Sequence, residues 1–108
     1  MREIKVILKP ERLSDVLRAL HAIPELPGVT VSMVRGFGRR YPLGSEPAFD
    51  EVERTKLEIV VPVALVPLVV DVVQRAAHTG QAGDGKIFVL PVEHAVNIRT
   101  GEYDLQAL

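Results

Sequence analysis

The chain has 108 residues, 47% hydrophobic and 25% charged, with a formal net charge of −1. These values indicate one globular domain, spanning residues 1–108, and give no basis for nonspecific binding to nucleic acids or membrane surfaces. The absence of cysteine excludes disulfides, a thiol nucleophile and thiolate metal sites. Because the chain enters a strand directly and no apolar run reaches membrane-spanning length, we expect a cytoplasmic protein without membrane insertion.

The first part of the chain predicts a strand, a helix and a second strand. Apolar residues alternate with others over 4–8, which is typical of a strand. Pro10 is suited to a first helical turn, and apolar residues recur at helical spacing over 13–20. A second strand is predicted over 29–37, and we expect Phe37 to be buried in the core.

Residues 39–53 show no sustained hydrophobic period and contain two prolines and a glycine. A connection of this length is usually functional or disordered, so we expect a flexible segment. Its acidic residues Asp50, Glu51 and Glu53 are candidates for a metal site, but a solvated loop is the favoured interpretation.

The second part of the chain repeats the order strand, helix, strand. The strands are predicted over 56–61 and 87–92, and the helix over 64–77. Pro67 is compatible with this helix only in its first turn, where N–H groups have no intrahelical partner. A short final segment, 95–99, is expected to pair on a sheet edge.

Two strand–helix–strand units in series predict an α+β fold, a ferredoxin-like split β-α-β (βαββαβ) sandwich with both helices on one face of the sheet. We expect Ile7, Ile59 and Val61 to place apolar area on the other face. Assembly of several copies would cover that area.

The segment 79–86 is rich in glycine and ends in a lysine. Glycines at 80, 83 and 85 allow successive N–H groups to converge on an anion, and Lys86 adds a positive charge. The spacing imitates a nucleotide-binding P-loop, but Ile87 stands where such a loop needs Ser or Thr, and the loop follows a helix instead of preceding one. A helix cap at Gly80 followed by a glycine-rich turn is an equally valid interpretation of this pattern.

Several segments together resemble the PII signal-transduction family, which comprises trimeric nucleotide-binding regulators of nitrogen metabolism. They occur in family order and cover most of the chain outside 39–53. The matching segments are 7–10 (ILKP), 34–39 (VRGFGR), 56–62 (KLEIVVP), 79–89 (TGQAGDGKIFV) and 98–102 (IRTGE).

The resemblance implies a homotrimer that binds an adenine nucleotide (ATP, ADP or AMP) in the clefts between subunits. The glycine-rich loop, the base of the family's long T-loop and the C-terminal segment would hold the phosphates, and two strand positions would help to select adenine. By this match the phosphates are held by Gly38, Arg39, Gly83, Asp84, Gly85, Lys86 and Arg99, and adenine is selected by Thr30 and Val60.

Two positions depart from the family pattern. Asn97 replaces a second phosphate-binding arginine, so we expect ADP or AMP to be favoured over ATP. Arg40 replaces a glutamine that helps to assemble magnesium and 2-oxoglutarate, and an arginine cannot ligate a cation. Sensing of 2-oxoglutarate in the family manner is therefore not expected, a role for magnesium stays open, and Arg40 is available to pair with another small anion such as bicarbonate. The T-loop-like segment is also short, with no tyrosine at its tip.

The resemblance favours a regulatory binding module over an enzyme. In this interpretation, nucleotide binding changes residues 39–53, which control a protein partner such as a transporter or a metabolic enzyme. Nucleic acid is not an expected partner. The alternatives are a weak nucleotide phosphohydrolase and a structural trimer with a vestigial nucleotide site.

Overall fold

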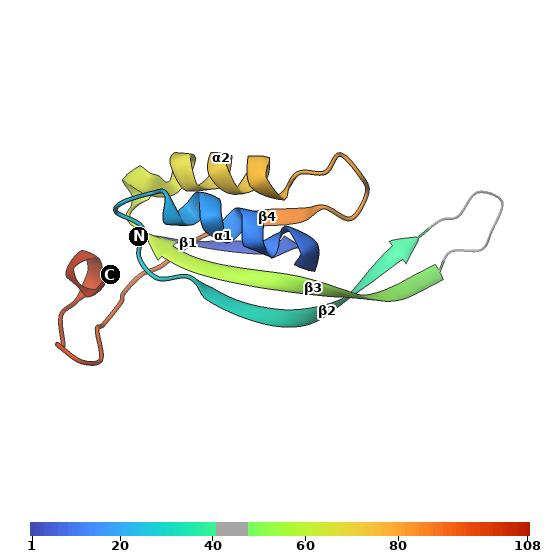
Figure 1. Cartoon of the computed structure of the whole chain (residues 1–108). Coiled ribbons are helices and arrows are strands. Elements are labelled where there is room, and N and C mark those ends of the chain that lie inside the picture. Colours follow the sequence, from blue (N-terminus) through green and yellow to red (C-terminus); the bar gives the residue numbers. More distant parts are fainter. Residues whose placement is uncertain (41–47) are drawn as a thin grey trace.

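The structure, a computed structural model, describes residues 1–40 and 48–108, with the side chains of 39, 40 and 48–50 outside that description. Four antiparallel strands form a sheet in the order β2-β3-β1-β4, and two helices cover one of its faces (Figure 1). This confirms the predicted α+β fold. The elements are β1 (Arg2–Leu8), α1 (Leu13–His21), β2 (Thr30–Arg40), β3 (Ala48–Val61), α2 (Val66–Ala77) and β4 (Gly85–Pro91), with short 3-10 turns at Pro10–Arg12, Val63–Leu65 and Asp104–Ala107.

Both helices form where the apolar spacing predicts them. Each begins after a short 3-10 turn, and Pro67 lies within the first two positions of α2, where its missing N–H breaks no hydrogen bond. The apolar stripe of each helix is buried against the sheet, as shown by Val16 on α1 and Val69 on α2. Among the described residues, neither helix is long and apolar enough to cross a membrane.

The core lies between the helices and one face of β1 and β3. Antiparallel pairing places Ile4 opposite Ile59 and Val6 opposite Leu57, and all four side chains are buried. The expectation that Ile59 and Val61 face away from the helices was therefore wrong. Because side chains alternate along a strand, Val60 faces away from the helices instead.

The open face of the sheet mixes charged and apolar side chains. By alternation it carries Ile7 as predicted, and Lys56 forms an ion pair with Glu58 across 3.5 Å. On β4, Phe88 is 46% exposed. A large aromatic side chain left exposed beside other apolar residues marks a surface suited to an interaction.

β2 and β3 continue well beyond the predicted strand ends. Their pairing runs from Thr30 opposite Glu58 to Arg40 opposite Ala48. The expected irregular segment 39–53 is therefore wrong at 39–40 and 48–53, and residues 41–47 lie outside the described part of the chain. The alternation of polar and apolar residues in this two-stranded part is too weak for the sequence to show where the two strands end.

The C-terminal segment does not pair on a sheet edge, so that prediction was wrong. Val96 instead forms an isolated bridge with Tyr103, within a turn closed by the N–H of Asn97 and the carbonyl of Glu102 at 2.8 Å. The segment satisfies its backbone groups locally, which a search for strand partners in the sequence cannot anticipate.

Burial of α1 can be tested with a leucine pair. Leu20→Ala, in which a 1% exposed side chain is truncated, is expected to lower the free energy of unfolding by about 2–5 kcal/mol. Leu68→Ala on α2, at 47% exposure, is the control and should change it by less than about 1 kcal/mol. Denaturant unfolding measures both values, and equal losses would contradict the described core.

Candidate functional site

A hollow of about 650 Å³ lies between the glycine-rich loop and the ribbon formed by β2 and β3. This size is within the usual range for small-molecule sites. Phe37, expected in the core, is 68% exposed and lines this hollow instead. The lining residues are Ile7, Gly36, Phe37, Gly38, Val52, Arg54, Gln81, Gly83, Asp84, Gly85, Lys86 and Phe88.

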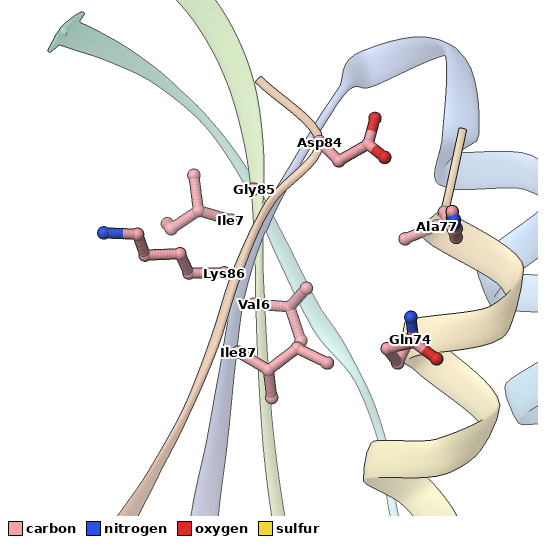
Figure 2. A pocket seen from close by; sticks show the side chains of 9 residues that line it. Val6, Ile7, Gln74, Ala77, Asp84, Gly85, Lys86 and Ile87 are labelled. Atoms are coloured by element: carbon pink, nitrogen blue, oxygen red, sulfur yellow. The ribbon is translucent and has the colours of Figure 1, made fainter. Parts of the chain in front are cut away.

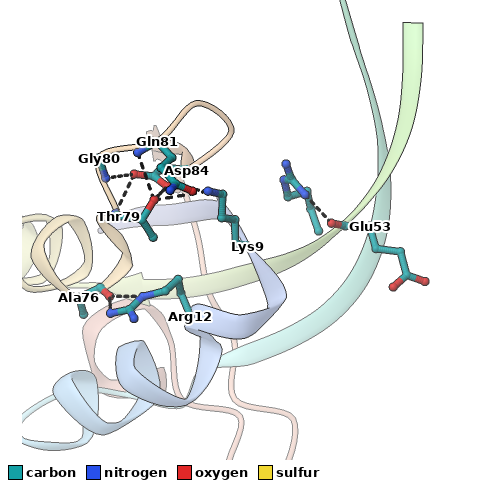
Figure 3. A network of polar contacts seen from close by, with 9 residues as sticks. Lys9, Arg12, Glu53, Ala76, Thr79, Gly80, Gln81 and Asp84 are labelled. Carbon is teal, nitrogen blue, oxygen red and sulfur yellow. Dashed lines mark hydrogen bonds and ion pairs between the residues drawn. The ribbon is translucent and has the colours of Figure 1, made fainter.

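The glycine-rich loop is closed by the carboxylate of Asp84 (Figure 3). Its Oδ2 accepts hydrogen bonds from the N–H groups of Thr79 at 2.8 Å and Gly80 at 3.0 Å, and its Oδ1 accepts one from the Thr79 hydroxyl. Lys9, which follows β1, places its Nζ 3.2 Å from Asp84 Oδ1 and 3.4 Å from Thr79 Oγ1. The loop is thus tied both to itself and to the end of β1.

These contacts stabilise the charged form of Asp84. Hydrogen bonds from the hydroxyl and the backbone N–H of Thr79, then from Gly80 N–H and Lys9, hold the pKa of the Asp84 carboxyl well below its usual range. Asp84 is therefore an anion throughout the physiological pH range.

Two glycines in the loop have a left-handed backbone, and at Gly85 a backbone contact also excludes any side chain. A Cβ on Gly85, at φ +109°, would lie 1.7 Å from the carbonyl oxygen of Ile7. A Cβ on Gly83, at φ +88°, would lie 3.0 Å from Nη2 of Arg54. Glycine at these positions lets β4 start beside β1 and lets the Arg54 guanidinium approach the loop.

Some backbone N–H groups of the loop have no hydrogen-bond acceptor among the described residues. Within that part of the chain, the N–H groups of Ala82 and Gly83 have no acceptor, and Lys86 is exposed and forms no ion pair. The helix α2 ends at Ala77 with His78 as its cap, so the interpretation of Gly80 as a helix cap was wrong. Free N–H groups beside a lysine can bind an anion.

Asp84 and Lys86 leave the chain on opposite sides. In Figure 2, Asp84 points toward α2, whereas Lys86 and Ile7 point to the other side of the strand. A second hollow, of about 450 Å³, includes Gln74 and His78 beside α2 in its lining, and Asp84 and Lys86 contribute to this hollow as well. The left-handed backbone at Gly85 separates the two side chains in this way.

The predicted site residues fall into two groups on one chain. Thr30 and Val60 line a separate hollow of about 500 Å³ that shares no lining residue with the first. Thr30 and Gly38 belong to the same strand, and at about 3.3 Å per residue roughly 26 Å of β2 separates them. One chain therefore brings together Gly38, Gly83, Asp84, Gly85 and Lys86, but not Thr30 or Val60.

The C-terminal candidates lie apart from both hollows. The amide oxygen of Asn97 accepts hydrogen bonds from the N–H groups of Arg99 at 3.0 Å and Thr100 at 3.1 Å, so this side chain organises the turn. The Arg99 residue is exposed. Arg39 and Arg40 continue β2, and their side chains lie outside the description.

Three polar residues near the loop were missed by the sequence analysis. Lys9 and Thr79 fix the Asp84 carboxylate, and Arg54 lines the main hollow. The long-range pairing of β1, β3 and the loop brings them together, and spacing along the chain carries no signal of it. The acidic candidate Glu51 forms an ion pair with Arg35 at 3.0 Å, and no cluster of metal-ligating side chains occurs among the described residues.

The fold and the loop define a small α+β sandwich with a glycine-rich loop at the start of its edge strand β4. The family model "Nitrogen regulatory protein P-II" matches residues 1–102. The nitrogen regulatory protein P-II of Azospirillum brasilense is 44% identical over 107 residues, covering 94% of this chain and 95% of the relative. That of Synechocystis sp. is 45% identical over the full length of both chains.

A solved structure is similar as well. The crystal structure of Arabidopsis thaliana PII bound to citrate matches with a TM-score of 0.84 and 40% identity, covering 99% of this chain and 91% of that one. The chain therefore belongs to the nitrogen regulatory protein P-II family. Its members among these relatives are named as regulators, which agrees with a signalling role.

The close approach at Gly85 can be tested directly. Gly85→Ala is expected to lower the free energy of unfolding by at least about 3 kcal/mol, because the new Cβ overlaps a backbone oxygen that the sheet holds in place. Gly28→Ala is the control, since nothing lies within 4 Å of its added Cβ. Thermal or denaturant unfolding measures the stability of both variants. Equal stability of Gly85→Ala and Gly28→Ala would contradict the described loop.

Proposed function

We propose that this P-II family member binds the phosphates of an adenine nucleotide at its glycine-rich loop and thereby regulates a partner protein. One observation carries the proposal: Gly83, whose N–H has no acceptor among the described residues, lines one hollow together with the exposed Lys86 and Arg54. Backbone donors and two cations around one space favour a multiply charged anion. The citrate held by the Arabidopsis relative, itself such an anion, supports this chemistry.

The phosphate contacts that we propose come from three parts of the chain. Residues 83–86 supply backbone N–H groups and the Lys86 ammonium, and Gly38 and Arg39 approach from β2. Arg99, which lies apart from this hollow on the same chain, would come from the C-terminal segment of a neighbouring copy. Asn97 adds no charge, and its amide oxygen already accepts two hydrogen bonds. With one cation fewer near the terminal phosphate, the site favours ADP or AMP over ATP.

The complete site requires a second copy of the chain. Thr30 and Val60, which would select adenine, line a hollow too far from Gly38 for one nucleotide to span both. A homotrimer places the loop of one copy beside the Thr30 hollow of the next. The partly apolar open face of each sheet, including Phe88 and Ile7, would be covered in that assembly.

Regulation would act through the T-loop-like segment 39–53. Gly38 lines the phosphate hollow and directly precedes this segment, so a bound nucleotide contacts its base. A protein partner, such as a transporter or a metabolic enzyme, is controlled if it distinguishes the bound from the empty state. Arg40 would pair with a small co-bound anion such as bicarbonate.

Calorimetry with ADP, AMP and ATP tests the nucleotide site. Lys86→Ala is expected to weaken ADP binding about 10- to 100-fold, because it removes a charged hydrogen bond to phosphate. Arg75→Gln on α2, which removes an exposed cation from an ion pair with Asp71, is the control and should bind normally. Absence of binding by the unchanged protein would overturn the proposal. Phosphate release that disappears in Lys86→Ala would favour the phosphohydrolase alternative.

The shared site can be tested by mixing subunits. Lys86→Ala damages the loop, and Thr30→Arg blocks the other hollow at an exposed position. Each variant alone should bind ADP weakly, whereas co-assembled mixtures should regain a fraction of full-affinity sites, because some clefts combine two intact halves. The mass of the mixed oligomer shows whether the two variants co-assemble. If co-assembled mixtures bind ADP no better than either variant alone, each site lies within one chain.

A further inference from the structure

We infer that the side chain of Asp84 is a positioning group that holds the phosphate loop from within, through Thr79 and Lys9, and that its carboxylate does not itself contact the ligand. This inference rests on the proposed function of the loop. It also revises the role that the family resemblance implies for Asp84, which is that of a direct ligand-binding residue.

The orientation of Asp84 supports this role. Its carboxylate points toward α2, whereas Lys86 points to the opposite side of the strand (Figure 2). Although both residues line both hollows, an anion bound at the Lys86 ammonium would lie on the other side of the strand from the Asp84 carboxylate. A carboxylate facing a phosphate would also repel it.

Both carboxylate oxygens of Asp84 are occupied by partners within the protein. Each carboxylate oxygen has two partners: Oδ2 accepts from the N–H groups of Thr79 and Gly80, and Oδ1 contacts the Thr79 hydroxyl and the Lys9 ammonium. The N–H of Gln81 in turn donates to Thr79 Oγ1 at 3.2 Å. The N-terminal half of the loop is thus closed by side chains, which leaves the N–H groups of Ala82 and Gly83 without an acceptor among the described residues.

Lys9 connects this network to the sheet. It follows β1 directly, its side chain is 13% exposed, and its charge is paired with Asp84. The loop therefore has one cation committed to its own structure, Lys9, and one exposed cation, Lys86. Removing the Asp84 carboxylate would release three loop donors and leave Lys9 with no carboxylate among the described residues.

Hydrogen exchange on the protein without nucleotide tests the closure. In Asp84→Asn, the amides of Thr79 and Gly80 should exchange at least about tenfold faster, because a charged acceptor is lost. The amide of Ile59 in the core should be unaffected. Asp71→Asn on α2 also removes a carboxylate from an exposed ion pair and should leave both loop amides unchanged.

Calorimetry with ADP on a double-mutant cycle tests the positioning role. Asp84→Asn and Thr79→Val should each weaken ADP binding about tenfold or more, and the double variant should be little worse than either, because both break one network. Thr79→Ser, which keeps the hydroxyl, should bind close to normally.

Two results would overturn the inference. Unchanged exchange of the Thr79 and Gly80 amides in Asp84→Asn would show that the carboxylate does not hold the loop. Additive losses in the cycle, or normal ADP binding by Thr79→Val, would show that Asp84 acts on the ligand directly. If the unchanged protein binds no nucleotide while the exchange result is as expected, the proposed function fails and the loop closure stands.

Discussion

The pairing of β1 on both sides is the constraint on which the structure depends. Each residue from Arg2 to Leu8 has a partner on β3 and another on β4. This register fixes which side chains reach the helices, because a shift by one residue would turn Ile4 and Val6 to the open face. It also fixes where β4 begins, opposite Leu8, and hence where the glycine-rich loop leaves the sheet.

The geometry of the candidate site depends on where β4 begins. Gly85 lies so close to the Ile7 carbonyl that no residue with a side chain can replace it. Its left-handed backbone directs the side chains of Asp84 and Lys86 to opposite sides of the strand. The same loop therefore separates an internal anion, which closes it, from an exposed cation, which remains free for a ligand. Lys9 can contact the closed side because it leaves β1 at the same edge of the sheet.

Much of the fold was predictable, because helical spacing and alternation are properties of single segments. Pro10 and Pro67 marked the helix starts, and the two strand–helix–strand units gave the topology. The sides of the sheet that Ile59 and Val61 face were predicted wrongly. Residues 59–61 are all hydrophobic, so the sequence does not show whether the odd-numbered or the even-numbered side chains are buried; the pairing of Ile59 with the buried Ile4 decides it. Phe37 was misplaced for a related reason: it lies on a part of β2 that no helix covers.

For the site, the family resemblance located the glycine-rich loop and Gly38, which the structure brings to one hollow. It could not locate Lys9 or Arg54, whose places near the loop depend on pairing between distant strands. It also could not reveal that Asn97 and Asp84 use their oxygens within their own turns. Whether a polar side chain is free or internally bonded depends on local geometry, not on residue type.

The ribbon of β2 and β3 has a mechanical consequence. β1 ends its pairing with β3 at Thr55, so the stretch from Val34 opposite Arg54 to Arg40 opposite Ala48 is a two-stranded hairpin arm without a third strand. Such an arm is only marginally stable in water. Its bending therefore costs little free energy, and the ligand proposed to bind at its base would need only a few kcal/mol of contact energy to change the direction in which the arm points.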